Sequence, residues 1–170
     1  MTAVPRWFDR TFEFTFPVEQ YPNLCMRLCG TPARLEELVH DAKHEALVRK
    51  PGDKWSAQEH AGHLLDLEHL WMSRVEDFIR GGDVLTVADL TNRKTEEANH
   101  NARSLPEILS GFRKARMELV NRLEKIEPPL ISRTMLHPRL QKPMRVVDHL
   151  FFVAEHDDHH LAKIWELIQS

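Results

Sequence analysis

Four long segments of this chain repeat apolar residues every three to four positions, the spacing of an amphipathic helix. We expect helices at about 32–48, 57–80, 105–126 and 144–168. Each helix would have one apolar stripe to bury, and four such stripes are covered together in a helical bundle. No βαβ pattern, internal repeat or low-complexity tract accompanies them. The sequence therefore predicts an all-α four-helix bundle that forms a single domain over residues 1–170.

Local signals predict where these helices begin and end. The segments 56–59 and 104–107 have the Ser-x-x-Glu pattern of a capping box. Thr31-Pro32 is typical of a helix start, with a capping side chain before a proline in the first turn. Gly30 is expected to end a short preceding helix over 22–29.

Three of the segments outside the four helices have an expected structure of their own. Residues 1–30 are expected to form an N-terminal arm followed by the short helix, with an extended stretch at 11–16 that pairs as one strand. Residues 83–103 are polar and weakly periodic, which predicts a surface connection with a short helix near 92–100. Residues 137–143 are expected to form a loop before the last helix.

Composition narrows the class of protein. The 170 residues suffice for one domain, and 23 basic against 26 acidic residues give a net charge of −3, which argues against a nucleic-acid partner. No apolar run approaches the length of a membrane span, and no secretory signal is visible. Cys25 and Cys29 are too few for a structural zinc site or a disulfide framework, so reduced cysteines and a cytoplasmic location are expected.

Histidine is the residue type that most needs explaining. Of 11 histidines, three lie within 60–69 and four within 149–160. His156 and His160 are one turn apart on the same flank of the last helix, an arrangement that can bind one metal ion. On the 57–80 helix, either His60 or His63 could meet this pair across the bundle. Three imidazoles leave a coordination position open for water or substrate.

The remaining histidines allow other interpretations. A single histidine on an apolar face is more often a hydrogen-bonded core residue than a ligand. His69 and His159 are expected to point toward solvent. His156-Asp157 also fits a phosphohydrolase of the His-Asp type, and the Glu-x-x-His spacing at 37–40 and 97–100 fits a di-iron bundle, although neither alternative accounts for the paired histidines.

Two acidic residues fall on apolar stripes, where an unpaired carboxylate is costly. Asp157 lies mid-stripe on the last helix and Glu68 faces inward on the 57–80 helix. Either could act as a base or orient a ligand histidine, and either could instead form a structural pair, in the case of Asp157 with an Arg, a Lys or Trp55. His137 and Arg139 could line the mouth of a site or only shape their loop.

The segments WSAQEHAGHLLDLEHLW (55–71) and HPRLQKPMRVVDHLFFVAEHDDHHLAKI (137–164) resemble the DinB/YfiT-like superfamily of metal-dependent enzymes. A weaker likeness covers GTPARLEELV at 30–39. The family pattern is a Trp-Ser-capped helix with one histidine and a last helix with His-x-x-His-His. The resemblance implies His63, His156 and His160 as metal ligands, and an up-down-down-up bundle, often dimeric, that binds nickel or zinc.

The resemblance does not imply one reaction, because members include thiol S-transferases, thiol-dependent isomerases and hydrolases. We therefore expect a metal-dependent enzyme that hydrolyses a small molecule or transfers a thiol to it, with a low-molecular-weight thiol as a cosubstrate in the second case. The alternative is a non-catalytic metal-binding or stress-response protein on the same bundle. The arm and the 83–103 connection lie outside the motifs and are expected to shape the pocket.

Overall fold

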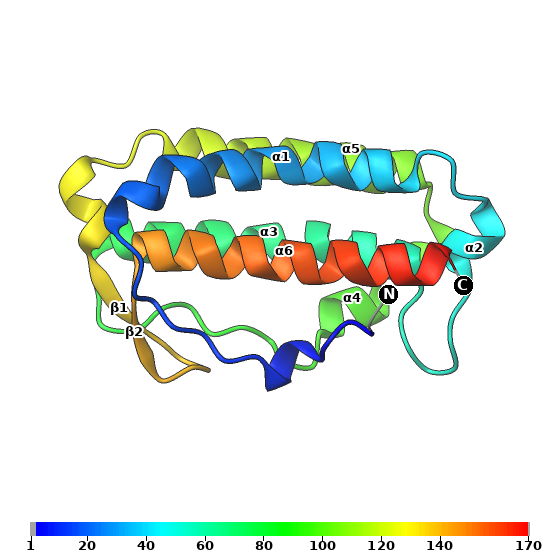
Figure 1. Cartoon of the computed structure of the whole chain (residues 1–170), viewed down its shortest axis with the longest axis horizontal. Helices are drawn as coiled ribbons and strands as arrows, with labels where there is room; N and C mark the ends of the chain where they lie inside the picture. Colours follow the sequence, from blue (N-terminus) through cyan, green and yellow to red (C-terminus); the bar gives the residue numbers. More distant parts are fainter. Residues whose placement is uncertain (1–2, 170) are drawn as a thin grey trace.

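The computed structural model describes residues 3–169, and four long helices form its frame (Figure 1). These are α1 (Tyr21–Val39), α3 (Ala57–Arg80), α5 (Leu105–Leu123) and α6 (Val146–Ile168). The predicted all-α four-helix bundle is confirmed. Within the described residues, no helix is long and apolar enough to cross a membrane.

The helices form two layers, α1 with α5 and α3 with α6 (Figure 1). Each of α1 and α3 packs against both α5 and α6. Followed from the N-terminal end, α1 and α6 run in one direction and α3 and α5 in the other, which is the up-down-down-up order (Figure 1). Because α3 and α5 are parallel, residues 81–104 must return along the whole bundle between them.

Shorter elements complete the chain. They are α2 (His44–Val48), α4 (Arg93–Glu97), the 3₁₀ turns Trp7–Asp9, Val18–Gln20, His100–Ala102 and Pro128–Ser132, and the strands β1 (Thr134–His137) and β2 (Lys142–Arg145). The strands pair antiparallel with Met135 opposite Met144. The sequence predicted only a loop here, and α6 begins after β2 rather than at residue 144. The strand predicted at 11–16 is wrong, because those residues of the arm adopt no strand.

The expected division at Gly30 is also wrong, because α1 runs through it without a break. Residues 21–30 therefore belong to the first bundle helix and not to the arm. Pro32 lies inside α1 and has no N–H to donate to the Leu28 carbonyl. That carbonyl instead accepts a hydrogen bond from Arg116 Nη1 at 3.3 Å. A hydrogen bond from α5 thus replaces the helical hydrogen bond that Pro32 cannot make, and α1 continues where the sequence predicted a boundary.

The two predicted capping boxes behave differently. Ser56 and Glu59 form theirs, with the Ser56 Oγ accepting from the Glu59 N–H and the Glu59 carboxylate accepting from the Ser56 N–H. Ser104 precedes α5 without any side-chain capping bond. The position of the helix start at 105 is nevertheless as predicted.

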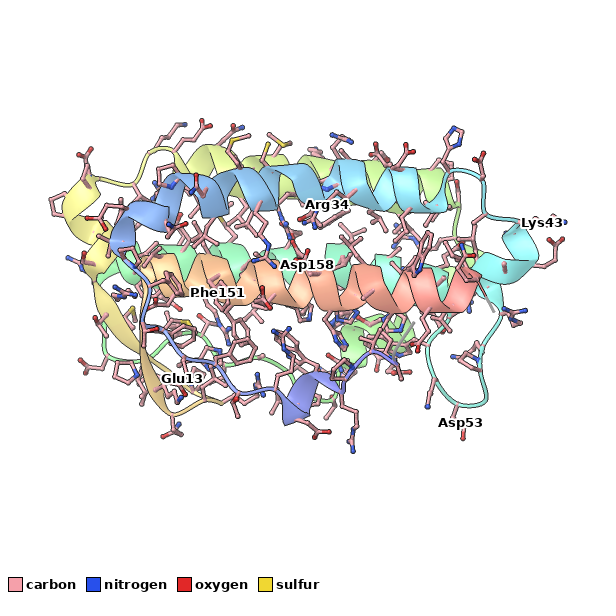
Figure 2. All side chains as sticks on the ribbon, viewed as in Figure 1. Glu13, Arg34, Lys43, Asp53, Phe151 and Asp158 are labelled. Atoms are coloured by element: carbon pink, nitrogen blue, oxygen red, sulfur yellow. The ribbon has the colours of Figure 1, made fainter. Side chains whose placement is uncertain are left out.

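A buried polar layer divides the core into two apolar clusters. Each long helix contributes one residue to it, and all four residues are at most 4% exposed: Thr31, Glu68, Arg116 and Asp157. A second polar contact lies at the outer edge of the α1–α6 interface, where Arg34 Nη1 bonds Asp158 Oδ1 at 2.6 Å (Figure 2). We refer to the four buried residues as the polar layer.

Candidate metal centre

Three histidines from α3 and α6 converge beside the bundle. His63, His156 and His160 are each at most 6% exposed, and one ring nitrogen from each lies within 4.8 Å of the others. The Nε2 atoms of His156 and His160 are 3.1 Å apart. Metal–nitrogen bonds of about 2.0–2.1 Å in tetrahedral geometry place two ligand nitrogens about 3.3 Å apart. The donor set therefore fits one divalent ion, and it is the set that the resemblance implied.

A chain of hydrogen bonds fixes the ring of His63. The single hydroxyl proton of Thr95 is donated to Asp66 Oδ2 at 3.0 Å. The Thr95 hydroxyl oxygen, its proton being used in this way, accepts from His63 Nδ1, also at 3.0 Å. With its proton on Nδ1, the imidazole has its lone pair on Nε2, which is free to bind a metal.

The Asp66 carboxylate is held in turn by His100, whose Nε2 lies 2.8 Å from Oδ2. The ring of His100 is fully buried and packs directly on Gly62. A Cβ atom at Gly62 would lie 2.2 Å from that ring, so only glycine permits this approach. The Gln58 amide further anchors the segment by donating to the His100 carbonyl at 2.7 Å.

His60 contacts the site from outside the ligand set. Its Nδ1 lies 2.8 Å from Nδ1 of His160. When Nε2 of His160 binds a metal, its proton is on Nδ1 and is donated to His60. The sequence pattern left His60 and His63 as alternatives, and the structure gives each a separate contact with the α6 pair.

Burial keeps these rings neutral. It lowers the pKa of His63 to about 4, and lowers the pKa of His156 and of His160 well below the ordinary 6.5, with neighbouring histidines adding to the effect on the α6 pair. Neutral imidazole is the form that binds a metal ion. The site is thus prepared for a metal near neutral pH without first releasing protons.

The histidines line one end of a pocket of about 330 Å³. Its floor is α3 and α6, and its walls come from the N-terminal arm, the 81–104 connection and the hairpin of β1 and β2. Trp7 of the arm packs its ring 5.1 Å from that of His156 and 5.7 Å from that of His159. His159 is thereby half-buried in the pocket, so the expectation that it points to solvent is wrong; His69 is exposed as expected.

Asp157 and Glu68 lie in the polar layer, where both accept hydrogen bonds from Arg116. Asp157 also accepts from Thr31 Oγ1 at 2.8 Å. Neither carboxylate is among the residues that line the pocket. The geometry therefore favours the structural pairing for both, through an arginine on α5.

Sequence reasoning missed Asp66, Thr95 and His100, the residues that support His63. They lie on α3 and in the polar connection, and nothing in the local periodicity marks them. Trp7 belongs to the N-terminal arm, and no sequence pattern predicts its contact with His156. His137 and Arg139 do line the pocket, at its far end.

Comparisons with known proteins agree with this description. The sequence profile of the DinB superfamily matches residues 27–164. The fold is similar to that of YfiT from Bacillus subtilis, with a TM-score of 0.79, 18% identity and coverage of 94% of this chain and 92% of that one. That protein is described as a probable metal-dependent hydrolase with an unusual four-helix bundle topology. A search of the curated proteins found no match.

Proposed function

This chain belongs to the DinB superfamily, and we propose that it is a metal-dependent enzyme that acts on a small molecule by hydrolysis or thiol transfer. The observation that carries the proposal is the three-histidine set beside a pocket, with ring nitrogens within 4.8 Å and no fourth ligand in the group among residues 3–169. Three protein ligands with one open position are typical of catalytic sites, whereas structural sites are closed by four.

A divalent cation at such a site supplies a Lewis acid that lowers the pKa of water or of a thiol to near neutrality. Nickel and zinc both accept imidazole ligands, and we propose one of them. The protein's own contribution is to hold the ligand rings still: Thr95 keeps the proton on Nδ1 of His63, and His60 accepts that of His160.

Indole rings pack around the ligand histidines and limit the access of water to them. The indoles of Trp7 and Trp71 lie against His156, with ring centroids 5.1 and 5.4 Å away. Trp55 covers His63 at 4.7 Å. An apolar pocket of this kind favours a substrate with an apolar body, and it strengthens the electrostatic effect of the cation.

Metal content and turnover test the proposal together. Untagged protein reconstituted with nickel or zinc should contain one ion per chain by elemental analysis. It should turn over members of a panel of activated esters, and of epoxides or alkyl halides with a small thiol.

His156→Ala should weaken metal binding by more than about 100-fold and abolish turnover, because loss of a ligand exceeds the effect of losing its supporting residue. His69→Ala is the matched control, since that ring is exposed on α3. Equal loss in both variants would contradict the site, and one bound ion without turnover of any member of the panel would favour the non-catalytic metal-binding alternative.

A further inference from the structure

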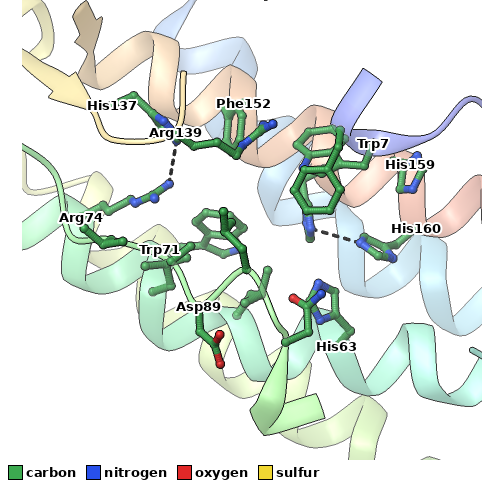
Figure 3. A pocket seen from close by; sticks show the side chains of 18 of the residues that line it. Trp7, His63, Trp71, Arg74, Asp89, His137, Arg139, Phe152, His159 and His160 are labelled. Atoms are coloured by element: carbon green, nitrogen blue, oxygen red, sulfur yellow. Dashed lines mark hydrogen bonds between the residues drawn. The ribbon is translucent and has the colours of Figure 1, made fainter. Parts of the chain in front are cut away.

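The pocket ends, opposite the histidines, in a group of nitrogen donors. Arg74 from α3 lies there with His137 at the end of β1 and Arg139 in the hairpin turn (Figure 3). Arg74 and His137 are each 1% exposed. This end of the pocket therefore holds a desolvated guanidinium beside a second one.

Arg74 has no carboxylate partner among residues 3–169. Its Nε donates to the Thr86 carbonyl at 2.9 Å, and its Nη1 lies 3.1 Å from His137 Nε2. The carboxylate of Asp77 is already bonded to Thr86 and Arg80. Burial lowers the pKa of Arg74 to about 10, which leaves it charged at neutral pH.

Arg139 also has no carboxylate or hydrogen-bond partner in the described part of the chain. Its guanidinium lies over the rings of Trp7, Phe8 and Phe152, at 5.3 to 6.0 Å. Its Nη2 is buried and has no hydrogen-bond acceptor among residues 3–169. A buried cationic donor without an acceptor is costly, which points to an acceptor supplied from outside the chain.

His137 adds an independent argument. Its Nδ1 accepts from the Leu140 N–H at 3.1 Å, and its Nε2 faces the Arg74 guanidinium, which can only donate. A neutral imidazole has only one accepting nitrogen. If Nδ1 accepts from Leu140, then Nε2 carries the proton and its N–H faces an N–H of Arg74. Burial and the two arginines lower the pKa of His137 to about 3, so the ring is neutral. An anionic oxygen near Nε2 and Arg74 would satisfy both donors.

Asp89 is the acidic residue that lines the pocket, and its carboxylate does not supply this oxygen. Asp89 is exposed, and its carboxylate accepts from the side chain and backbone of Thr91 and from the Arg93 N–H. The Asp89 carboxylate is therefore engaged in shaping the turn before α4.

We propose that Arg74, His137 and Arg139 bind the carboxylate of a small organic acid, whose apolar body lies along Trp71 and Phe152 toward the histidines. Arg forks match the two oxygens of a carboxylate. His63 and Arg74 are eleven positions apart on α3, about 16 Å along its axis, so the acid spans the pocket between anchor and metal centre. The position of the reacting group rests on the proposed function, whereas binding of the carboxylate does not.

Calorimetric titration of the metal-reconstituted protein with 4-phenylbutyrate and with 4-phenylbutanol tests the anchor, because the two ligands share a body and differ in charge. The acid should bind at least about tenfold more tightly, since a hydrogen bond to a charged group contributes that much. Arg139→Gln should abolish the preference, and Arg74→Lys should weaken it. Arg122→Gln should keep it, because that guanidinium pairs with Glu76 on another surface.

Equal binding of acid and alcohol, or a preference unchanged by Arg139→Gln, would overturn the proposal. Inorganic phosphate is the competing anion, and binding tighter than that of phenylbutyrate would assign the anchor to phosphates instead. The titration is repeated on metal-free protein. A preference that persists without turnover contradicts the proposed function alone, and an active enzyme without the preference contradicts the anchor alone.

Discussion

The polar layer and the pocket both place ionisable groups from α3 and α6 out of water, and they treat them in opposite ways. In the polar layer, Arg116 pairs with the carboxylates of Glu68 and Asp157. Thr31 donates a further hydrogen bond to Asp157, and the Leu28 carbonyl accepts one from Arg116. In the pocket, imidazoles face one another at 3.1 Å and two guanidiniums have no carboxylate partner among the described residues. Asp157 and His156 are neighbours in sequence but belong to these two different environments. Between these two regions, completed hydrogen bonding accompanies the structural role, and incomplete bonding accompanies the candidate ligand sites.

Removing the centre of the polar layer should have the largest effect. Arg116→Met leaves two buried carboxylates without their cation, and should lower the free energy of unfolding by about 3–5 kcal/mol. Arg122→Met is the control, since its surface pair with Glu76, in which both side chains are about a third exposed, should cost at most about 1 kcal/mol. Urea denaturation measures both. Equal costs would mean that the layer contributes no more than a surface ion pair.

The pH dependence of stability should carry a signature of the same layer. Burial raises the pKa of Glu68 from 4.5, the value expected in the unfolded chain, to about 7. The positive charge of Arg116 lowers this pKa but does not cancel the effect of burial. The folded state therefore keeps a proton that the unfolded state releases. This stabilisation is complete below about pH 4.5 and is lost as pH rises through about 7.

Compared with Glu68→Gln, the wild type should thus lose on the order of 2–3 kcal/mol between pH 5 and pH 8. Denaturant titrations at several pH values measure the difference. Glu76→Gln is the control, because Arg122 lowers the pKa of Glu76 and places its smaller effect in the acid range. A difference between wild type and Glu68→Gln that is constant with pH would refute this assignment.

On the pocket side, Thr95→Val should weaken metal binding by about 10- to 100-fold while leaving the fold intact. The substitution keeps the shape of the side chain and removes the oxygen that fixes the His63 ring. Competition with a chelator measures the affinity. Thr91→Val, on the exposed turn of the same connection, should leave it unchanged.

The smallest effect distinguishes two helical glycines. Gly62→Ala should cost about 1–2 kcal/mol, because the new Cβ would overlap the His100 ring and outweigh the better helix propensity of alanine. Gly111→Ala should be neutral or stabilising by about 0.5–1 kcal/mol, since its Cβ would meet only the tip of Leu65 at 3.3 Å. Thermal unfolding compares them, and a stabilised Gly62→Ala would show that His100 is free to move away.

Sequence reasoning succeeded where periodicity and local chemistry determine the structure. The α3 bounds and the Ser56 cap followed from the apolar stripe and the capping box. The inward positions of Glu68 and Asp157 followed from the same stripes, but their shared partner on α5 did not. The spacing of His156 and His160 predicted a site, and the resemblance selected His63.

The failures have a common cause, because each depends on contacts between distant segments. Pro32 continues a helix because Arg116 bonds the carbonyl that it leaves free. Thr95 supports His63 because Asp66 and His100 dock the connection onto α3. No local pattern encodes such docking.

The parallel direction of α3 and α5 has a consequence for how this pocket can diversify. A tight turn cannot join parallel helices, so the bundle always carries a crossover long enough to span it, here residues 81–104. Lengthening such a surface segment costs little entropy, because closure free energy grows only with the logarithm of length. The crossover can thus acquire new side chains over the histidines while the helices that hold the metal ligands keep their sequence. Substrate preference and fold stability become separately adjustable traits, and directed evolution confined to residues 87–90, the part of the crossover that lines the pocket without supporting His63, should change the first before the second.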